Sequence, residues 1–212
     1  MRHHLIPLTS LTSRALDLAD EGADGPLRTA LVNTLMRYLD TDSLLCWAPE
    51  PVPDPPGYET HVGRVESLRS IQMRTALPII QFLTEKVWPG VEIVPVLEEG
   101  SIMPIPQPQN TQDVIRGWVM GLPAWELAGL ERAVLAGKGL IGAVRLVVEW
   151  SAEFEGIGER RCGVEEAAKA MSLEVDWQTG MWGAVEDTHD VEREDVRRQL
   201  GSVVLLVSAE SV

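Results

Sequence analysis

The sequence has few cysteines and few positive charges. Only Cys46 and Cys162 are present among 212 residues, which excludes a disulfide framework and the paired spacing of a zinc site. We therefore expect two free thiols. Lysine and arginine number 18 against 32 acidic residues, giving a net charge of −14. The basic surface that binds nucleic-acid phosphates or an anionic membrane is therefore missing.

Long apolar runs and common catalytic motifs are also missing. No stretch approaches the roughly 20 apolar residues of a membrane-spanning helix. The patterns H-E-x-x-H, G-x-S-x-G and C-x-x-C do not occur, and there are only four histidines. Aromatic residues are scarce, but seven of the eleven are tryptophan, a residue common at contact surfaces.

Apolar residues recur at helical spacing along most of the chain. The expected helices cover residues 9–20, 27–39, 64–87, 111–121, 123–136, 140–154, 164–183 and 190–208. Thr9 or Ser10 is expected to cap the first and Thr111 the fourth, and Pro78 is expected to kink or split the third. The second should face the core through Leu27, Ala30, Leu31, Thr34, Leu35, Tyr38 and Leu39. Residues 91–94 suit a short β segment.

These patterns predict a mainly α fold, a multi-helix bundle with at most a minor β element. We expect one helical domain over residues 9–212, with a proline-rich loop at about 49–60. The segment 137–142, GKGLIG, matches the dinucleotide pattern G-x-G-x-x-G. That site needs a preceding strand, whereas the preceding residues have a helical pattern. We therefore interpret the segment as a corner between two helices.

The stretch MWGAVEDTHD, residues 181–190, holds the strongest candidate site. If one helix continued through it, a single stripe would contain Glu174, Gln178, Met181, Trp182, Val185 and His189. Such mixed stripes are typical of interfaces, and also of a carboxylate that caps a neighbouring helix. Two alternatives stay open: a metal-dependent enzyme using Glu174, Glu186 and His189, and a generic helical interaction scaffold.

The same stretch resembles the C-terminal signature of the mitochondrial F1-ATPase assembly chaperones that act on the α subunit. That signature is roughly L-E-x-x-x-Q-x-x-x-W-G-x-V-E-x-x-H-D, and nine positions fall in register: Leu173, Glu174, Gln178, Trp182, Gly183, Val185, Glu186, His189 and Asp190. Upstream, YLDTDSLLCW resembles another family segment through Thr41, Asp42 and Cys46. The chain departs from the family at Ala76 and Leu77 and in its proline-rich insert.

The resemblance implies a chaperone of the mitochondrial matrix, without cofactor, metal or catalysis. It would bind the unassembled F1 ATP synthase α subunit, shield the α/β interface and promote F1 assembly, without nucleic acid or membrane insertion. It implies a helical C-terminal domain lacking the family's β-rich N-terminal domain, with residues 1–8 left from the linker, and a monomer when free. The expected partner-binding residues are Glu174, Gln178, Trp182, Gly183, Glu186, Asp187, His189 and Asp190.

Two substitutions separate the roles expected within this stretch. Glu186 lies at the edge of the stripe, so Glu186→Lys should weaken α-subunit binding about tenfold and leave folding intact. Glu174 is expected deeper in the helix, among apolar neighbours and tied to a helix end or an arginine. Glu174→Lys is therefore expected to lose both stability and binding.

Overall fold

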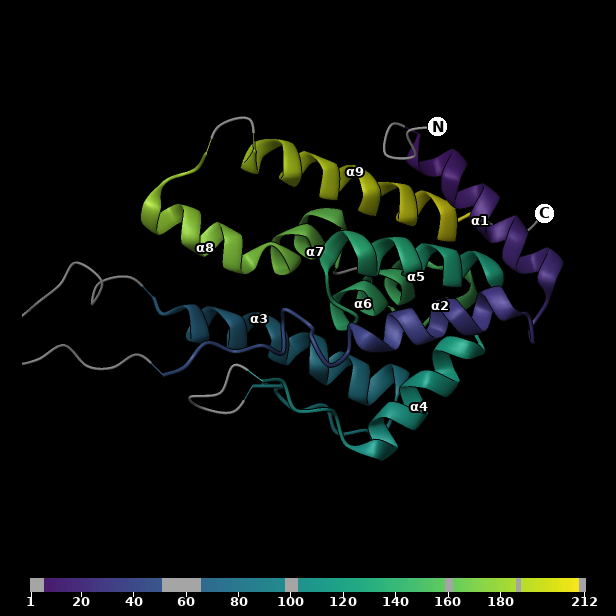
Figure 1. Ribbon diagram of the computed structural model, residues 1–212, viewed down its shortest axis with the longest axis horizontal. Helices are drawn as coiled ribbons and strands as arrows, with labels where there is room; N and C mark the ends of the chain where they lie inside the picture. The colour runs from purple at the N-terminus through teal and green to yellow at the C-terminus, as the bar shows by residue number, and fades with distance from the viewer. Residues whose placement is uncertain (1–5, 51–65, 98–102, 159–161, 186–187, 210–212) are drawn as a thin grey trace, which may run out of the picture.

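Nine α-helices build the part of the chain that the computed structural model describes, residues 6–50, 66–97, 103–158, 162–185 and 188–209 (Figure 1). They are α1 Pro7–Glu21, α2 Pro26–Arg37, α3 Leu68–Phe82, α4 Gln109–Met120, α5 Ala124–Gly137, α6 Ile141–Trp150, α7 Val164–Met171, α8 Leu173–Trp182 and α9 His189–Val207. These residues contain no strand, which confirms the mainly α prediction. None of their helices combines the length and the apolar character needed to cross a membrane.

Helices α5 and α6 form the centre of the core. Figure 1 shows α1 and α9 on one side of this pair and α2, α3 and α4 on the other, and the packing of α5 against α1, α6 and α9 agrees with this view. Eight of the ten residues of α6 are buried, namely Ile141, Gly142, Ala143, Val144, Leu146, Val147, Val148 and Glu149. A helix that is apolar nearly all round is stable only when neighbours cover every face, as they do here.

The expected side-chain caps of two helices are wrong. Helix α1 begins with Pro7 in its first turn, and the Ser10 hydroxyl donates to the Pro7 carbonyl oxygen. Thr111 lies inside α4, where its hydroxyl donates to the Glu92 carbonyl oxygen at 2.7 Å. Proline needs no cap at the first helical position, because its missing N–H would have had no partner within the helix.

Pro78 does not divide the third helix, contrary to the expectation for residues 64–87. Helix α3 continues through it, and the irregularity follows as a π-helical turn over Leu83–Val87. Proline removes the N–H that would bond to the carbonyl of Arg74. Both residues are exposed, so water can take the place of the missing bond.

The buried face of α2 is rotated from the predicted stripe. Ala30 and Thr34 are exposed, whereas Arg28 is buried. The Arg28 guanidinium donates to the carbonyl oxygens of Met120 and Leu122, at the end of α4. A buried arginine is stable when such acceptors satisfy it, and hydrophobic periodicity cannot reveal this.

The β segment expected at residues 91–94 is not a strand. The Gln107 side chain holds Val94 by accepting from its N–H at 2.9 Å and donating to its carbonyl oxygen at 2.7 Å. Val96 donates to the carbonyl oxygen of Leu45. The Gln107 side chain and a single backbone contact therefore bond to the N–H and carbonyl groups of this part of the chain. In a sheet, a neighbouring strand would do so.

Both cysteines are free, as predicted, and both are partly buried. Burial raises the pKa of the Cys46 thiol, and it raises the pKa of the Cys162 thiol from 9.0 to about 11. Because only the thiolate reacts, alkylation of Cys162 by iodoacetamide at pH 8 should be roughly 100-fold slower in the folded protein than in urea. Mass spectrometry of timed samples measures both rates, and equal rates would contradict the burial argument.

Candidate partner-binding surface

The segment expected as one helix over residues 164–183 is two helices followed by a loop. A break at Ser172 separates α7 from α8, and Gly183, with a φ of +91°, ends α8. A left-handed φ of this kind favours glycine. His189 begins α9 and therefore does not continue the stripe of α8. The stripe from Glu174 to His189 required one continuous helix, and this condition is not met.

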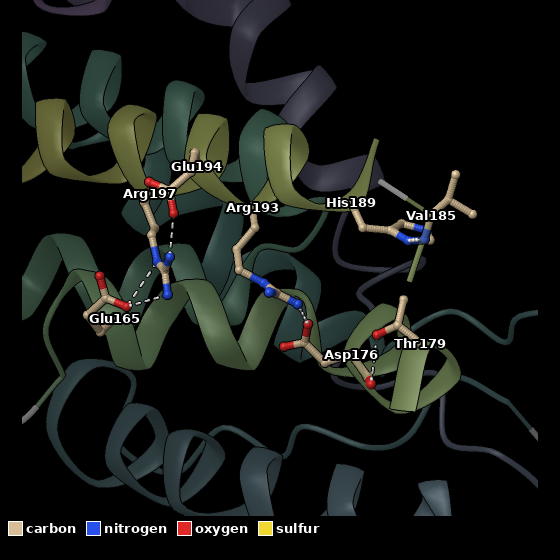
Figure 2. Close-up of polar contacts among 8 residues, drawn as sticks. All are labelled: Glu165, Asp176, Thr179, Val185, His189, Arg193, Glu194 and Arg197. Atoms are coloured by element: carbon tan, nitrogen blue, oxygen red, sulfur yellow. Dashed lines mark hydrogen bonds and ion pairs between the residues drawn. The ribbon is translucent and has the colours of Figure 1, made fainter. Parts of the chain in front are cut away.

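Helix α8 is attached to the bundle mainly by polar contacts. None of its residues is buried. Arg193 of α9 forms an ion pair with Asp176 of α8 at 2.7 Å, while Arg197 pairs with Glu165 at 2.9 Å and so joins α9 to α7 (Figure 2). The Trp177 indole N–H donates to the carbonyl oxygen of Glu66. Exposed pairs of this type contribute about 0–1 kcal/mol each, so they orient α8 more than they stabilise it.

His189 closes the loop between α8 and α9. Its Nδ1 accepts a hydrogen bond from the backbone N–H of Val185 at 2.9 Å (Figure 2). This bond occupies one of the two ring nitrogens that could act as a base or a metal ligand. The structure thus gives His189 a local role, which is to hold the loop residue Val185 at the start of α9.

Trp182 is the most exposed aromatic side chain of the predicted site, with 74% of its surface accessible. Its ring meets that of Trp177 edge to face, with 6.2 Å between centroids. Gly183, Val185 and Asp190 are also exposed, Val185 at 59%. Glu186 and Asp187 lie outside the described residues. The structure therefore gathers part of the predicted set around the loop between α8 and α9.

Glu174 is exposed, which corrects the expectation that it lies deep among apolar neighbours. It accepts a hydrogen bond from the Gln178 side chain at 3.0 Å, and no arginine of the described residues pairs with it. The physical reason is that α8 begins after the break at Ser172 and buries none of its residues, so that its acidic side chains remain accessible.

Val191 is an exposed apolar residue close to this loop in the sequence, and the sequence reasoning did not select it. It is 59% exposed, at the start of α9. It lines a shallow depression together with Thr188, Asp190, Glu192, Glu194, Asp195 and Arg198. The signal in the sequence was a single apolar residue within the acidic run HDVERED. We call the exposed set Trp182, Gly183, Val185, Asp190 and Val191 the Trp182 surface.

The GKGLIG segment is the corner between α5 and α6, as predicted. Lys138 has a φ of +54°, and a Cβ at Gly139 would lie 2.8 Å from a carboxylate oxygen of Asp42. That carboxylate accepts the N–H groups of Leu140 and Ile141, at the start of α6. The glycine therefore admits a protein carboxylate to the position that a phosphate would occupy in a dinucleotide site.

The metal hypothesis rested on Glu174, Glu186 and His189. Among the residues that can be described, no group of three histidine, cysteine, aspartate or glutamate side chains is arranged to hold a metal ion. Glu174 bonds to Gln178, His189 bonds to Val185, and Glu186 lies outside those residues.

Because Glu174 is exposed, we expect Glu174→Lys to change the free energy of unfolding by no more than about 1 kcal/mol. The small loss comes from placing a cation in the first turn of α8, where the helix dipole favours acidic residues. Urea unfolding followed by circular dichroism measures the change, with Glu174→Gln as the neutral control. A loss above about 2 kcal/mol would show that this carboxylate supports the fold.

Comparison with known proteins finds similarity to proteins named Atp12. Residues 1–84 match the family described as ATP12 chaperone protein. Mitochondrial protein atp12 of Schizosaccharomyces pombe is 30% identical over 206 residues, covering 97% of this chain and 62% of the relative. Mitochondrial protein ATP12 of Saccharomyces cerevisiae is 29% identical over 221 residues, covering 97% and 65%. The chain thus spans less than two thirds of either relative.

A solved structure has the same fold. The crystal structure of Atp12 from Paracoccus denitrificans superposes with a TM-score of 0.67 at 17% identity, covering 96% of this chain and 74% of that one.

Proposed function

We propose that this chain is a member of the ATP12 chaperone family, which its likeness to that family and to two mitochondrial Atp12 proteins supports. We further propose that it binds the unassembled α subunit of F1 ATP synthase and promotes F1 assembly. In this proposal the chaperone covers the surface of α that later meets the β subunit. An unassembled subunit exposes apolar interface that would otherwise aggregate, and a bound chaperone prevents this.

The observation that carries the proposal is the Trp182 surface. It presents an exposed indole and two exposed valines next to acidic side chains at the start of α9. Tryptophan is enriched among the residues that contribute most to binding energy, and acidic neighbours favour a basic partner. The net charge of −14 adds a long-range attraction to such a partner.

The proposal also covers where in the cell the protein acts and whether it catalyses a reaction. The two yeast relatives are named mitochondrial, which supports placing this chain in the mitochondrial matrix. The chaperone works by binding alone, without catalysis or cofactor, and is a monomer when free.

Co-purification tests the proposal. The tagged chain is expressed with the F1 α subunit, and in parallel with the β subunit as the control. Recovery of α in near-equal amount, without β, is the expected result. Failure to recover α under conditions that keep it soluble would reject the proposal. Equal recovery of both subunits would indicate a general chaperone without selectivity for α.

A further inference from the structure

A pocket of about 290 Å³ lies between α8, the first half of α9 and the corner between α5 and α6. The lining residues that decide its chemistry are Met171, Glu174, Val175, Asp176, Gln178 and Val196. Pockets for drug-sized ligands measure roughly 300–1,000 Å³. This one, which we call the Glu174 pocket, is slightly smaller than that range and is large enough to admit one long side chain.

The lining of the Glu174 pocket is apolar in part and polar elsewhere. Met171, Val175 and Val196 supply apolar surface. Glu174 and Gln178 add a carboxylate and an amide from α8, joined by their hydrogen bond. A side chain that combines an aliphatic stem with a polar head would satisfy both parts of this lining.

Two of the three acidic side chains that line the pocket form ion pairs with described residues of the protein, and the third does not. Glu192 pairs with Lys138 at 3.4 Å, and Asp176 pairs with Arg193 at 2.7 Å. Within the described residues, Glu174 has its hydrogen bond to Gln178 but no cation at ion-pair distance. An incoming cation would therefore find one acidic lining group that no arginine or lysine of these residues already neutralises.

We infer that the Glu174 pocket receives an arginine side chain of the bound α subunit. The methylene groups of the arginine pack on Val175 and Val196, and the guanidinium donates two hydrogen bonds to the Glu174 carboxylate. A planar guanidinium matches a carboxylate in this paired geometry, whereas the lysine ammonium does not. This inference rests on the proposed function, and it adds the chemistry of one anchoring contact.

The first experiment needs no α subunit. N-acetyl-arginine amide is titrated into the ¹⁵N-labelled chain to 50 mM, with N-acetyl-citrulline amide as the uncharged isostere. We expect arginine to shift the signals of Val175, Gln178 and Val196 with a dissociation constant in the millimolar range, and citrulline to shift them at least fivefold less. Shifts elsewhere, no shifts, or equal shifts from the two compounds would overturn the inference.

Matched variants assign the effect to one carboxylate. Glu174→Gln keeps an acceptor for Gln178 and removes the charge, and it should abolish the difference between arginine and citrulline. Glu155→Gln removes one charge from an exposed residue outside the pocket and should leave that difference intact. An undiminished preference for arginine in Glu174→Gln would overturn the assignment.

The second experiment connects the pocket to the α subunit. Glu174→Gln should weaken α binding about tenfold, and Glu155→Gln should bind as the parent does. If the parent binds α and Glu174→Gln binds it equally well, the pocket inference fails and the proposed function stands. If the parent does not bind α, the proposed function fails, and the inferred role of the pocket in α binding fails with it.

Discussion

Replacing Asp42 with alanine is expected to lower the free energy of unfolding by at least about 3 kcal/mol. The Asp42 carboxylate is completely buried and accepts the backbone N–H groups of Leu44, Leu140 and Ile141. Alanine would leave these groups without that partner. A buried polar group that loses its hydrogen bond costs about 1–3 kcal/mol, and several are affected together.

Urea unfolding followed by circular dichroism at pH 7 measures this loss. Thr41→Ala is the matched control, because the exposed Thr41 hydroxyl donates to the Arg37 carbonyl oxygen one turn earlier and holds no other element of the described part of the chain. The control should lose less than about 0.5 kcal/mol. A loss below 1 kcal/mol for Asp42→Ala would show that this carboxylate does not hold the corner between α5 and α6.

The difference in unfolding free energy between the parent and Asp42→Ala should also depend on pH, and the raised pKa of Asp42 sets the direction. Burial raises the pKa of Asp42 from 3.8 to about 6, against the opposing effect of its backbone hydrogen bonds. Between pH 6 and pH 4 the folded state therefore binds a proton that the unfolded state does not, so acidification favours folding through this group. The stability deficit of Asp42→Ala should grow by about 2–3 kcal/mol over this interval. A deficit that shrinks on acidification would contradict the raised pKa.

Replacing Trp182 with aspartate is expected to weaken binding of the F1 α subunit by about 30-fold or more. Hot-spot residues contribute 2 kcal/mol or more, which corresponds to roughly this factor. Because 74% of the Trp182 surface is already exposed, the melting temperature should change little. The aspartate also adds negative charge, which would strengthen the long-range attraction to a basic partner. A loss of binding would therefore come from the lost indole contact and not from a change in charge.

Isothermal titration calorimetry with purified α subunit measures the effect. Trp125→Asp serves as the matched control, because Trp125 is 36% exposed near the start of α5, away from the loop between α8 and α9. Binding by the control should remain within about twofold of the parent. If Trp182→Asp binds as well as the parent while the parent binds α, the Trp182 surface is not the contact site.

Some features of this protein were predictable because they depend on local chemistry. The sequence predicted a mainly α fold, the two free thiols and the helix corner at residues 137–142, and the structure confirms each. Helical periodicity needs only neighbouring residues, and two distant cysteines leave little scope for a framework of disulfides. Helix α6 is buried for a similarly local reason, because nearly all of its residues are apolar.

Other features depend on partners that are far away along the chain. Arg28 is buried because the end of α4 supplies carbonyl acceptors, and Asp42 is buried because the start of α6 supplies N–H donors. Neither partner can be identified from local periodicity.

The exposure of the candidate site residues could not be predicted from local periodicity either. The residues of the stretch 174–190 were selected from the sequence, but the break at Ser172 and the left-handed Gly183 decide which ones are exposed. A helix that continued unbroken would have kept Glu174 and His189 on one stripe, whereas the fold places them on two helices around one pocket.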